Sequence, residues 1–121
     1  MRWFSGHVSA RWLSDGRSME IEQRLTYRDG KGRKWFAEKG LIVDGASIPR
    51  FFWRFMGGPF SGRYRRASVI HDAYCQSKTV PSKEVHAVFY EMMRFDRVPR
   101  LKALAMWAAV RFFGPRFKGK P

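Results

Sequence analysis

Two short motifs organise this 121-residue chain: Asp44-Gly45-Ala46-Ser47-Ile48-Pro49 and Val69-Ile70-His71-Asp72-Ala73-Tyr74-Cys75. The first motif contains glycine and ends in proline, so it predicts a structured turn. The second motif places an adjacent His-Asp pair in an otherwise apolar helical pattern. No other part of the sequence concentrates so many reactive groups. We therefore expect the rest of the chain to hold these two motifs together.

The region before the first motif, residues 1–43, predicts strands and tight turns. Met19, Ile21, Leu25 and Tyr27 share one parity, which is the period-two pattern of a half-buried strand. Asp-Gly pairs on both sides of this strand are typical of hairpins. The sequence thus predicts an antiparallel sheet of three or four strands. The expected turns are residues 15–16 and 29–32, and the expected partner strands are residues 3–13, 33–37 and 41–43.

The second half of the chain predicts helices. Residues 44–62 form a loop in which Pro49 opens a single helical turn that runs to Met56. Three longer helices are expected between residues 63 and 114, and residues 115–121 form a basic tail. The predicted helices run from Arg63 to about Gln76, from Ser82 to about Phe95 and from Pro99 to Gly114.

Apolar positions at helical spacing predict which face of each later helix is buried. The second helix has one such face, made of Val85, Val88, Phe89 and Met92. The third helix has a stripe that we expect to complete the core, although its basic ends also suit a membrane surface. This stripe consists of Leu101, Leu104, Ala105, Ala108 and Phe112. Together these patterns predict one α+β domain, with a small N-terminal antiparallel sheet packed against about three C-terminal helices.

The composition restricts the class of protein. The chain is 45% hydrophobic, which excludes a disordered chain, and its formal net charge is +14. This charge favours acidic partners such as nucleic acid, anionic lipid headgroups or cell-wall polymers, whereas the simplest alternative is a solvated basic surface. A single cysteine, Cys75, excludes an internal disulfide. No apolar run is long enough to span a membrane, and no secretory signal is recognisable, so synthesis in the host cytoplasm is expected.

The His-Asp pair predicts a candidate site with three catalytic residues, His71, Asp72 and Asp44. His71 can act as a base while Asp72 binds a cation. The same residues could instead bind a metal ion such as zinc or calcium, with Asp72, His71 and His86 as ligands. His86 would reach the site if the second helix packs antiparallel against the first. Asp44 and Glu91 are further candidate ligands.

Structural roles explain the same residues without any chemistry. A lone histidine near the middle of a helix is often a core residue whose nitrogens are hydrogen-bonded locally. Asp44 could close an Asx-type turn at the start of the first motif. Cys75 lies four residues after His71, a spacing that seldom gives a nucleophile and its base the required geometry. Ser47 lacks the Gly-x-Ser-x-Gly context of a nucleophile elbow.

The two motifs resemble those of the phage and prophage proteins grouped as domain-of-unknown-function family 1353. In that family a strand ends in a Thr-Asp-Gly-Ala-Ser-Ile-Pro-like segment, and an aromatic loop and an Ala-Ala-Val-Ile-His-Asp-x-x-Tyr-like helix follow. A second helix of the type Ala-Asp-x-x-Phe-x-x-x-Met comes next. The resemblance covers about residues 18–114. Val43 replaces the usual threonine, and His86 stands where the family usually has aspartate.

A looser similarity connects residues 71–75 with the helix pair of secreted phospholipases A2. In those enzymes the histidine is the base, the next aspartate holds calcium, and an aspartate on the second helix orients the histidine. Only His71 and Asp72 match cleanly. Tyr74 is one position short of the enzymes' tyrosine, the flanking disulfide cysteines are absent, and the orienting residue would be His86. This substitution favours a metal site with two histidines over the phospholipase mechanism.

The resemblance implies a phage or prophage origin and two competing functions. In the first, the chain is a small hydrolase-like protein with a cleft formed by Asp44, His71, Asp72 and His86, and it cleaves a lipid ester or cell-wall bond of the bacterial envelope. In the second, it is a non-enzymatic virion component, such as a tail or baseplate part, in which these residues fix a loop to a helix. Nucleic-acid binding through the basic surface is a third hypothesis, based on charge alone.

Overall fold

The structure is a computed structural model that describes residues 2–45, 48–56, 62–114 and 116–119. Within these ranges short strands precede helices, which confirms the predicted α+β class. The strands are β1 (Trp3–Phe4), β2 (Ala10–Trp12), β3 (Met19–Ile21), β4 (Leu25–Arg28), β5 (Lys34–Ala37) and β6 (Ile42–Val43). The helices are α1 (Trp53–Met56), α2 (Arg65–Ser77), α3 (Ser82–Phe95) and α4 (Arg100–Phe113), with 3-10 turns η1 (Arg50–Phe52) and η2 (Gly62–Tyr64).

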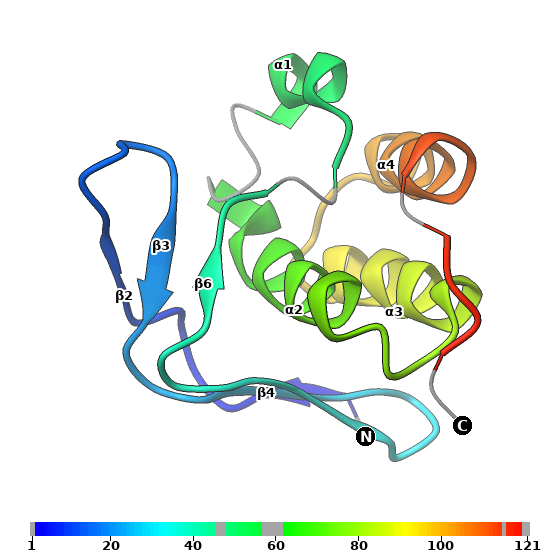
Figure 1. Cartoon of the computed structure of the whole chain (residues 1–121). Coiled ribbons are helices and arrows are strands. Elements are labelled where there is room, and N and C mark those ends of the chain that lie inside the picture. Colours follow the sequence, from blue (N-terminus) through cyan, green and yellow to red (C-terminus); the bar gives the residue numbers. More distant parts are fainter. Residues whose placement is uncertain (1, 46–47, 57–61, 115, 120–121) are drawn as a thin grey trace.

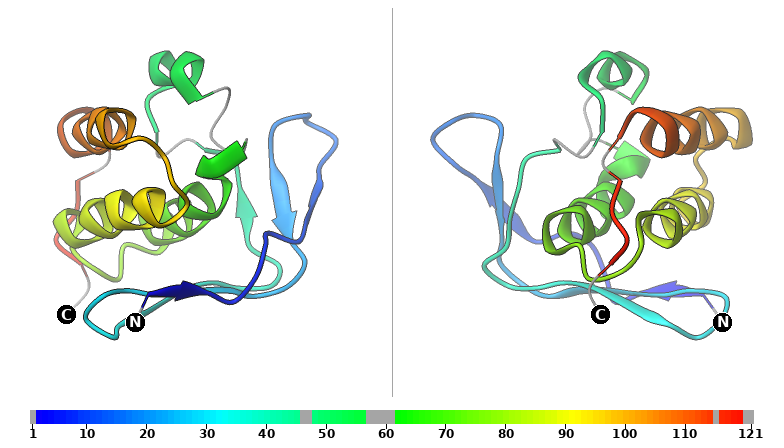
Figure 2. Two further views of the ribbon diagram at one scale, coloured as in Figure 1. Left: turned by 180° about the vertical axis from the view of Figure 1, so that it is seen from behind. Right: turned by 45° about the vertical axis from the view of Figure 1, so that its right-hand side comes forward.

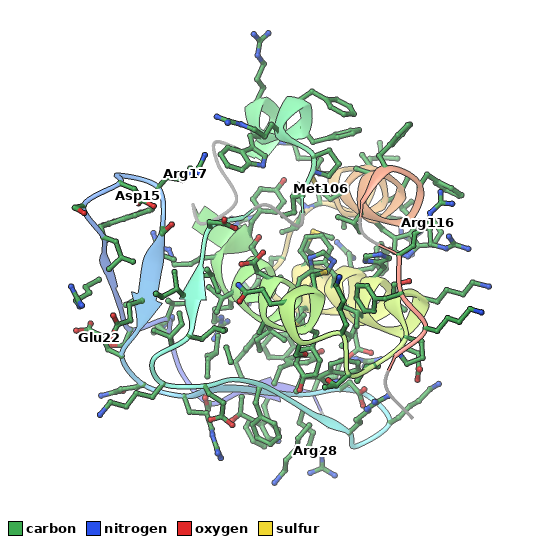
Figure 3. All side chains as sticks on the ribbon, viewed as in Figure 1. Asp15, Arg17, Glu22, Arg28, Met106 and Arg116 are labelled. Carbon is green, nitrogen blue, oxygen red and sulfur yellow. The ribbon has the colours of Figure 1, made fainter. Side chains whose placement is uncertain are left out.

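The strands form two small antiparallel sheets where one was predicted. Their strand orders are β1-β4-β5 and β2-β3-β6. The long strand expected around residues 19–27 is divided, because Glu22 and Gln23 form a bend and the three consecutive polar residues 22–24 are exposed (Figure 3). The buried residues occupy odd positions both before and after the bend. The same four side chains therefore enter the core, two from each sheet. These are Met19, Ile21, Leu25 and Tyr27.

Both predicted hairpin turns are present, and an aspartate organises each of them. The Asp15 carboxylate accepts hydrogen bonds from the Ser18 hydroxyl and from the backbone N–H groups of Ser18 and Arg17, which lower the pKa of Asp15 to about 2. The Asp29 carboxylate accepts the backbone N–H of Arg33 and the indole N–H of Trp35. Acceptor side chains thus close the β2–β3 and β4–β5 turns.

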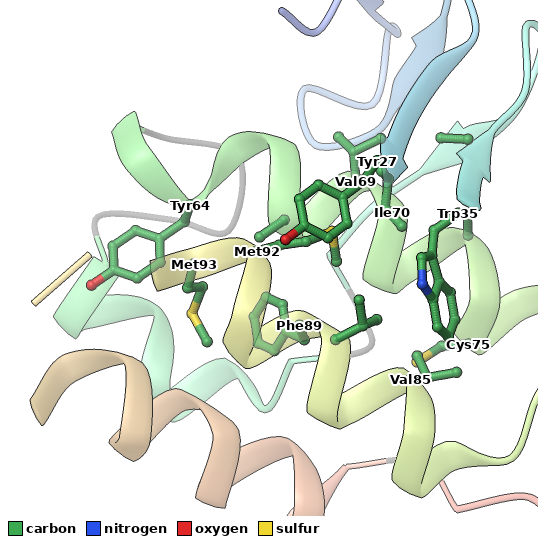
Figure 4. Packing of buried hydrophobic residues seen from close by; sticks show 14 of the residues in the cluster. Tyr27, Trp35, Tyr64, Val69, Ile70, Cys75, Val85, Phe89, Met92 and Met93 are labelled. Atoms are coloured by element: carbon green, nitrogen blue, oxygen red, sulfur yellow. The ribbon is translucent and has the colours of Figure 1, made fainter. Parts of the chain in front are cut away.

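The helices form two layers above the β1-β4-β5 sheet. Helices α2 and α3 lie side by side next to the strands, and α4 packs on α3 on the far side from β4 (Figures 1 and 2). The predicted inner face of α3 is confirmed, because Val85, Phe89 and Met92 are fully buried. Figure 4 shows Phe89 and Met92 packed with Ile70 of α2 in the centre of the core.

The predicted orientation of α4 is wrong. Its stripe was expected to face the core, but Leu101 is 81% exposed, Leu104 is 42% exposed and Phe112 is 54% exposed. Four other residues are buried instead, and they form the face of α4 that lies against the rest of the molecule. These are Ala103, Met106, Ala109 and Val110. Helix α4 is therefore apolar on two faces, and its smaller side chains are the ones that pack inward.

The segment after α4 returns along the helices to the beginning of α3. The backbone N–H of Phe117 donates to the Ser82 hydroxyl, and the backbone N–H of Ser82 donates to the Phe117 carbonyl. Gly119 lies so close to Pro81 that a Cβ atom would come within 2.9 Å of the Pro81 nitrogen. Figure 1 shows this segment running from α4 toward the sheet side of the molecule. No helix among the described residues has the length and apolar character needed to cross a bilayer.

Candidate functional site

Helices α2 and α3 bring the two candidate histidines together in the core. Nε2 of His71 lies 2.9 Å from Nδ1 of His86, a hydrogen-bond distance. His71 is 0% exposed and His86 is 1% exposed. The Phe89 ring packs against His71 with 4.4 Å between ring centroids. The expectation that His86 would reach His71 from the neighbouring helix is therefore met.

In this contact one of the two ring nitrogens donates the hydrogen bond and the other accepts it. Burial, together with the charge of the adjacent His86, holds the pKa of His71 well below its usual range. His71 is consequently neutral at physiological pH, so one of its ring nitrogens can donate a hydrogen bond and the other can accept one. The Cys75 thiol completes the group, with its Sγ atom 3.7 Å from His71 Nε2. Cys75 therefore contacts His71, as its i+4 spacing allows, inside the core.

Asp72 faces a different set of partners. Its Oδ2 atom accepts the backbone N–H of Asp44 at 3.2 Å and the amide N–H of Gln76 at 3.1 Å. The same Gln76 amide donates to the carbonyl of Ile42 at 2.7 Å. These four residues, which we call the β6–α2 clasp, fix the end of strand β6 to helix α2. Asp72 is 2% exposed, so its charge depends on these donors for stabilisation.

The structure thus shows two direct contacts among the four predicted site residues. His71 is paired with His86 between α2 and α3, and Asp72 is paired with the Asp44 backbone between α2 and β6. Gln76 was missed by sequence reasoning, although its i+4 spacing from Asp72 on one helix was a usable signal. Ser47, the other candidate of the first motif, lies outside the described residues.

Glu91, proposed as a further ligand, belongs to another part of the molecule. Its carboxylate accepts the Tyr27 hydroxyl and the backbone N–H of Gly30, and it forms an ion pair with Arg2 at 3.3 Å. Glu91 lies five residues after His86, so the two side chains leave α3 about 140° apart. Glu91 therefore links α3 to the β1-β4-β5 sheet and is directed away from the histidine pair.

An open pocket of about 250 Å³ lies beside the described residues of the first motif. Asp44 contributes to its wall, and Arg17 and Arg50 also line it. The Trp53 indole N–H donates to the Ile48 carbonyl at 3.1 Å, which fixes the aromatic wall of the pocket. Asp44 is the predicted site residue that borders this pocket, whereas His71 and Asp72 are buried in the fold.

The predicted metal site stays a prediction. Within the part of the chain that the structure describes, no three His, Cys, Asp or Glu side chains gather in a way that could hold a metal ion. Because His71 Nε2 and His86 Nδ1 are joined by a hydrogen bond, binding of zinc or calcium through these atoms would require the pair to give up that bond. The site as it stands is a buried, hydrogen-bonded histidine pair next to a carboxylate-centred clasp.

The lowered pKa of His71 predicts that the protein becomes less stable in mild acid. The folded state disfavours a proton on His71, whereas the unfolded state binds one below a pKa of about 6.5. The free energy of unfolding should therefore decrease as pH falls below about 6.5, by up to about 1.4 kcal/mol per pH unit for this group. Urea unfolding at about pH 7.5 and about pH 5 measures the change.

The matched variant for this test is His71→Gln, which keeps a neutral hydrogen-bonding side chain. It should reduce the loss of stability between the two pH values. His7→Gln removes an exposed histidine and should leave that loss unchanged. An identical pH dependence in the wild type and in His71→Gln would contradict the assignment.

Comparisons with known proteins connect the two motifs to a family without an assigned activity. A family model described as "Protein of unknown function (DUF1353)" matches residues 19–110. The uncharacterized protein y4jT of Sinorhizobium fredii (strain NBRC 101917 / NGR234) is 46% identical over 96 residues, which are 79% of this chain and 29% of that protein. The uncharacterized protein y4iH of the same strain is 42% identical over 91 residues, which are 75% of this chain and 38% of that protein. No solved structure matches.

Proposed function

This chain belongs to the DUF1353 family, and we propose that it is a non-enzymatic structural component of a phage or prophage particle, such as a tail or baseplate part. The observation that carries the proposal is the engagement of the motif residues inside the fold. His71 and His86 bond to each other, and Asp72 bonds to the backbone of Asp44 and to Gln76. These contacts join α2 to α3 and α2 to β6.

Burial favours a structural role for these groups. A buried polar side chain costs free energy unless a partner replaces its hydrogen bonds to water, so it is retained where it specifies a contact. His71, Asp72 and His86 are each no more than 2% exposed. The resemblance to phage and prophage proteins supports the particle as the setting. Other particle proteins would then be its partners.

The Asp72→Asn variant tests the structural role. Asparagine keeps the shape but removes the charge that strengthens the bonds from Asp44 and Gln76, so the free energy of unfolding should fall by about 1–3 kcal/mol. Glu22→Gln is the control, since Glu22 is exposed on the surface, and it should change stability by less than about 0.5 kcal/mol. Urea unfolding provides the measurement.

Assays of hydrolytic activity and of association with particles use the same proteins. The wild type should release no product from lipid esters or from peptidoglycan above the rate in buffer. It should also co-purify with intact particles when produced in the phage-infected or induced host. Hydrolysis by the wild type that disappears in Asp72→Asn, with stability unchanged, would overturn the structural proposal.

A hydrolase acting on the bacterial envelope is the second candidate. It is favoured by the position of Asp44 at the edge of an accessible pocket. Asp44 borders the 250 Å³ pocket and would place a carboxylate next to a substrate. A divalent cation such as zinc or calcium would be the cofactor of the metal-dependent form of this hypothesis.

The metal content of the purified protein separates the two candidates. The hydrolase hypothesis expects stoichiometric zinc or calcium that is lost in both His71→Ala and His86→Ala, together with loss of lipid-ester or cell-wall hydrolysis. The structural proposal expects no stoichiometric metal, with both variants merely less stable. Elemental analysis of the wild type and the two variants distinguishes these outcomes.

A further inference from the structure

The outer face of α4 is an apolar surface that the proposed function does not use. Its residues lie at positions i, i+3, i+4, i+7 and i+11, which fall on one side of an α-helix. We define the α4 outer face as Leu101, Leu104, Ala105, Ala108 and Phe112. Helix α4 lies on the side of α3 that is remote from the β1-β4-β5 sheet, and the short helix α1 lies farther from the sheet still (Figures 1 and 2).

Exposure of this face is large for apolar side chains. Leu101 is 81% exposed and Phe112 is 54% exposed. At the C-terminal end of the helix Phe113 is 69% exposed, and its ring centroid lies 6.0 Å from that of Phe51, which is 61% exposed. Scattered single apolar residues on a surface are ordinary, but a continuous row of them along a helix marks a binding surface.

The charges around the α4 outer face are all positive. Every charged residue after Asp96 in the sequence is Lys or Arg. Viewed down the helix axis, Arg100 and Arg111 lie on the same edge of the face. Arg100 is at the N-terminal end of this edge and Arg111 is at its C-terminal end. The Arg111 guanidinium lies 5.5 Å from the centroid of the Phe112 ring. Trp107, whose ring is 6.1 Å from that of Phe112, adds an aromatic of the kind found at membrane interfaces.

We propose that the α4 outer face binds the surface of an anionic lipid bilayer, with α4 parallel to the membrane plane. Its leucines and Phe112 would enter the boundary between headgroups and acyl chains, while Arg100 and Arg111 contact lipid phosphates. An apolar face with cations at both ends, on a helix whose own sequence contains no Asp or Glu, has the charge complementarity that such a surface requires. The proposal does not depend on whether the histidine pair is structural or catalytic.

Charge also decides between a membrane and a second copy of the chain. Two copies packed through this face would bring together two sets of arginines and lysines, each from a chain of net charge +14. Repulsion between these charges opposes self-association, whereas an anionic headgroup layer attracts the same residues. The anionic bilayer is therefore the occupant that the surface fits.

Vesicle co-sedimentation tests the proposal with two lipid compositions. The wild type should bind vesicles of phosphatidylcholine mixed with phosphatidylglycerol at least about tenfold more tightly than vesicles of phosphatidylcholine alone, and added salt should weaken this binding. The double variant Leu101→Ser/Phe112→Ser should bind at least about tenfold more weakly, because it removes the two most exposed large apolar side chains of the α4 outer face. Arg100→Gln/Arg111→Gln should reduce the preference for anionic vesicles.

Trp12→Ser provides the control, because Trp12 is 60% exposed on strand β2, outside the helical layers. It should bind vesicles as the wild type does. Circular dichroism and thermal unfolding should show the α4 variants folded, since the replaced side chains are exposed. Absence of binding to both vesicle types, or equal binding by the wild type and Leu101→Ser/Phe112→Ser, would overturn the proposal. So would a dimer, measured by light scattering, that this variant converts to a monomer.

Discussion

Replacing His71 with alanine is expected to lower the free energy of unfolding by about 3–5 kcal/mol. The substitution would leave a cavity beside Phe89, whose ring centroid is 4.4 Å from that of His71. It would also leave Nδ1 of His86, which is 1% exposed, without its hydrogen-bond partner on α2. Both costs arise at the contact between α2 and α3, where they affect the whole core. Urea unfolding monitored by tryptophan fluorescence measures the loss.

A double-mutant cycle shows whether the histidine pair itself is responsible. His71→Ala and His86→Ala each remove the same hydrogen bond, so the double variant should be more stable than the sum of the two losses predicts, by about 0.5–3 kcal/mol. His7→Ala, at an exposed histidine, should change stability by less than about 0.5 kcal/mol. Strictly additive losses would mean that the two rings do not act as a pair.

Asp96→Ala is the second substitution with a large expected effect. The Arg66 guanidinium donates to both carboxylate oxygens of Asp96, to the carbonyl of Gly6 at 3.0 Å, and lies 4.2 Å from the centroid of the Phe4 ring. Arg66 thereby connects the first turn of α2, the end of α3 and the segment after β1. The Asp96 side chain is 10% exposed and that of Arg66 is 20% exposed, so the pair is largely shielded from water.

Removal of Asp96 should destabilise the protein by about 2–4 kcal/mol, because a mostly buried guanidinium loses its counter-ion. The matched control is Glu38→Ala, which breaks the exposed ion pair between Glu38 and Arg24, where both side chains are 58% exposed. That variant should lose at most about 1 kcal/mol. Thermal and urea unfolding of the two variants measure the difference, and equal losses would show that burial does not strengthen the Arg66–Asp96 pair.

Local signals predicted much of the fold correctly. The turns at Asp15 and Asp29 were recognisable because each aspartate supplies the acceptor that its own turn needs. Prolines 49 and 99 precede helical segments, as the fixed φ of proline favours, and Gly114 follows the last helix. Such features depend on residues close together in sequence, so the sequence alone contains the information.

Features decided by tertiary packing were not predictable in the same way. Helix α4 is apolar around most of its circumference, so its periodicity could not show that Met106 and Val110 would be buried while Leu101 would be exposed. The bend after Ile21 could not be recognised in the sequence either. The buried residues lie at odd positions both before and after it, so the pattern is the same as that of one continuous strand. In both cases the sequence pattern fits two arrangements, and contacts with distant segments select one.

The sequence indicated which residues form the candidate site, but it indicated their arrangement in space only in part. Helical spacing indicated that His71 and Asp72 leave α2 in different directions, and the meeting of His71 with His86 followed from the expected packing of α3. The partner of Asp72 is a backbone N–H of Asp44 in a loop after β6, and no spacing rule locates such a contact. The two direct contacts among the four residues were therefore established only by the structure.

The course of the segment after α4 determines where neighbouring sequence can be attached to this unit. Strand β1 lies in the β1-β4-β5 sheet, and Gly119 lies beside Pro81 in the loop between α2 and α3. Figures 1 and 2 place both ends of the chain toward the sheet side, away from α4. A longer polypeptide that carries this unit would join it at that side. A fusion tag attached at either end would thus begin on the side of the molecule opposite to α4.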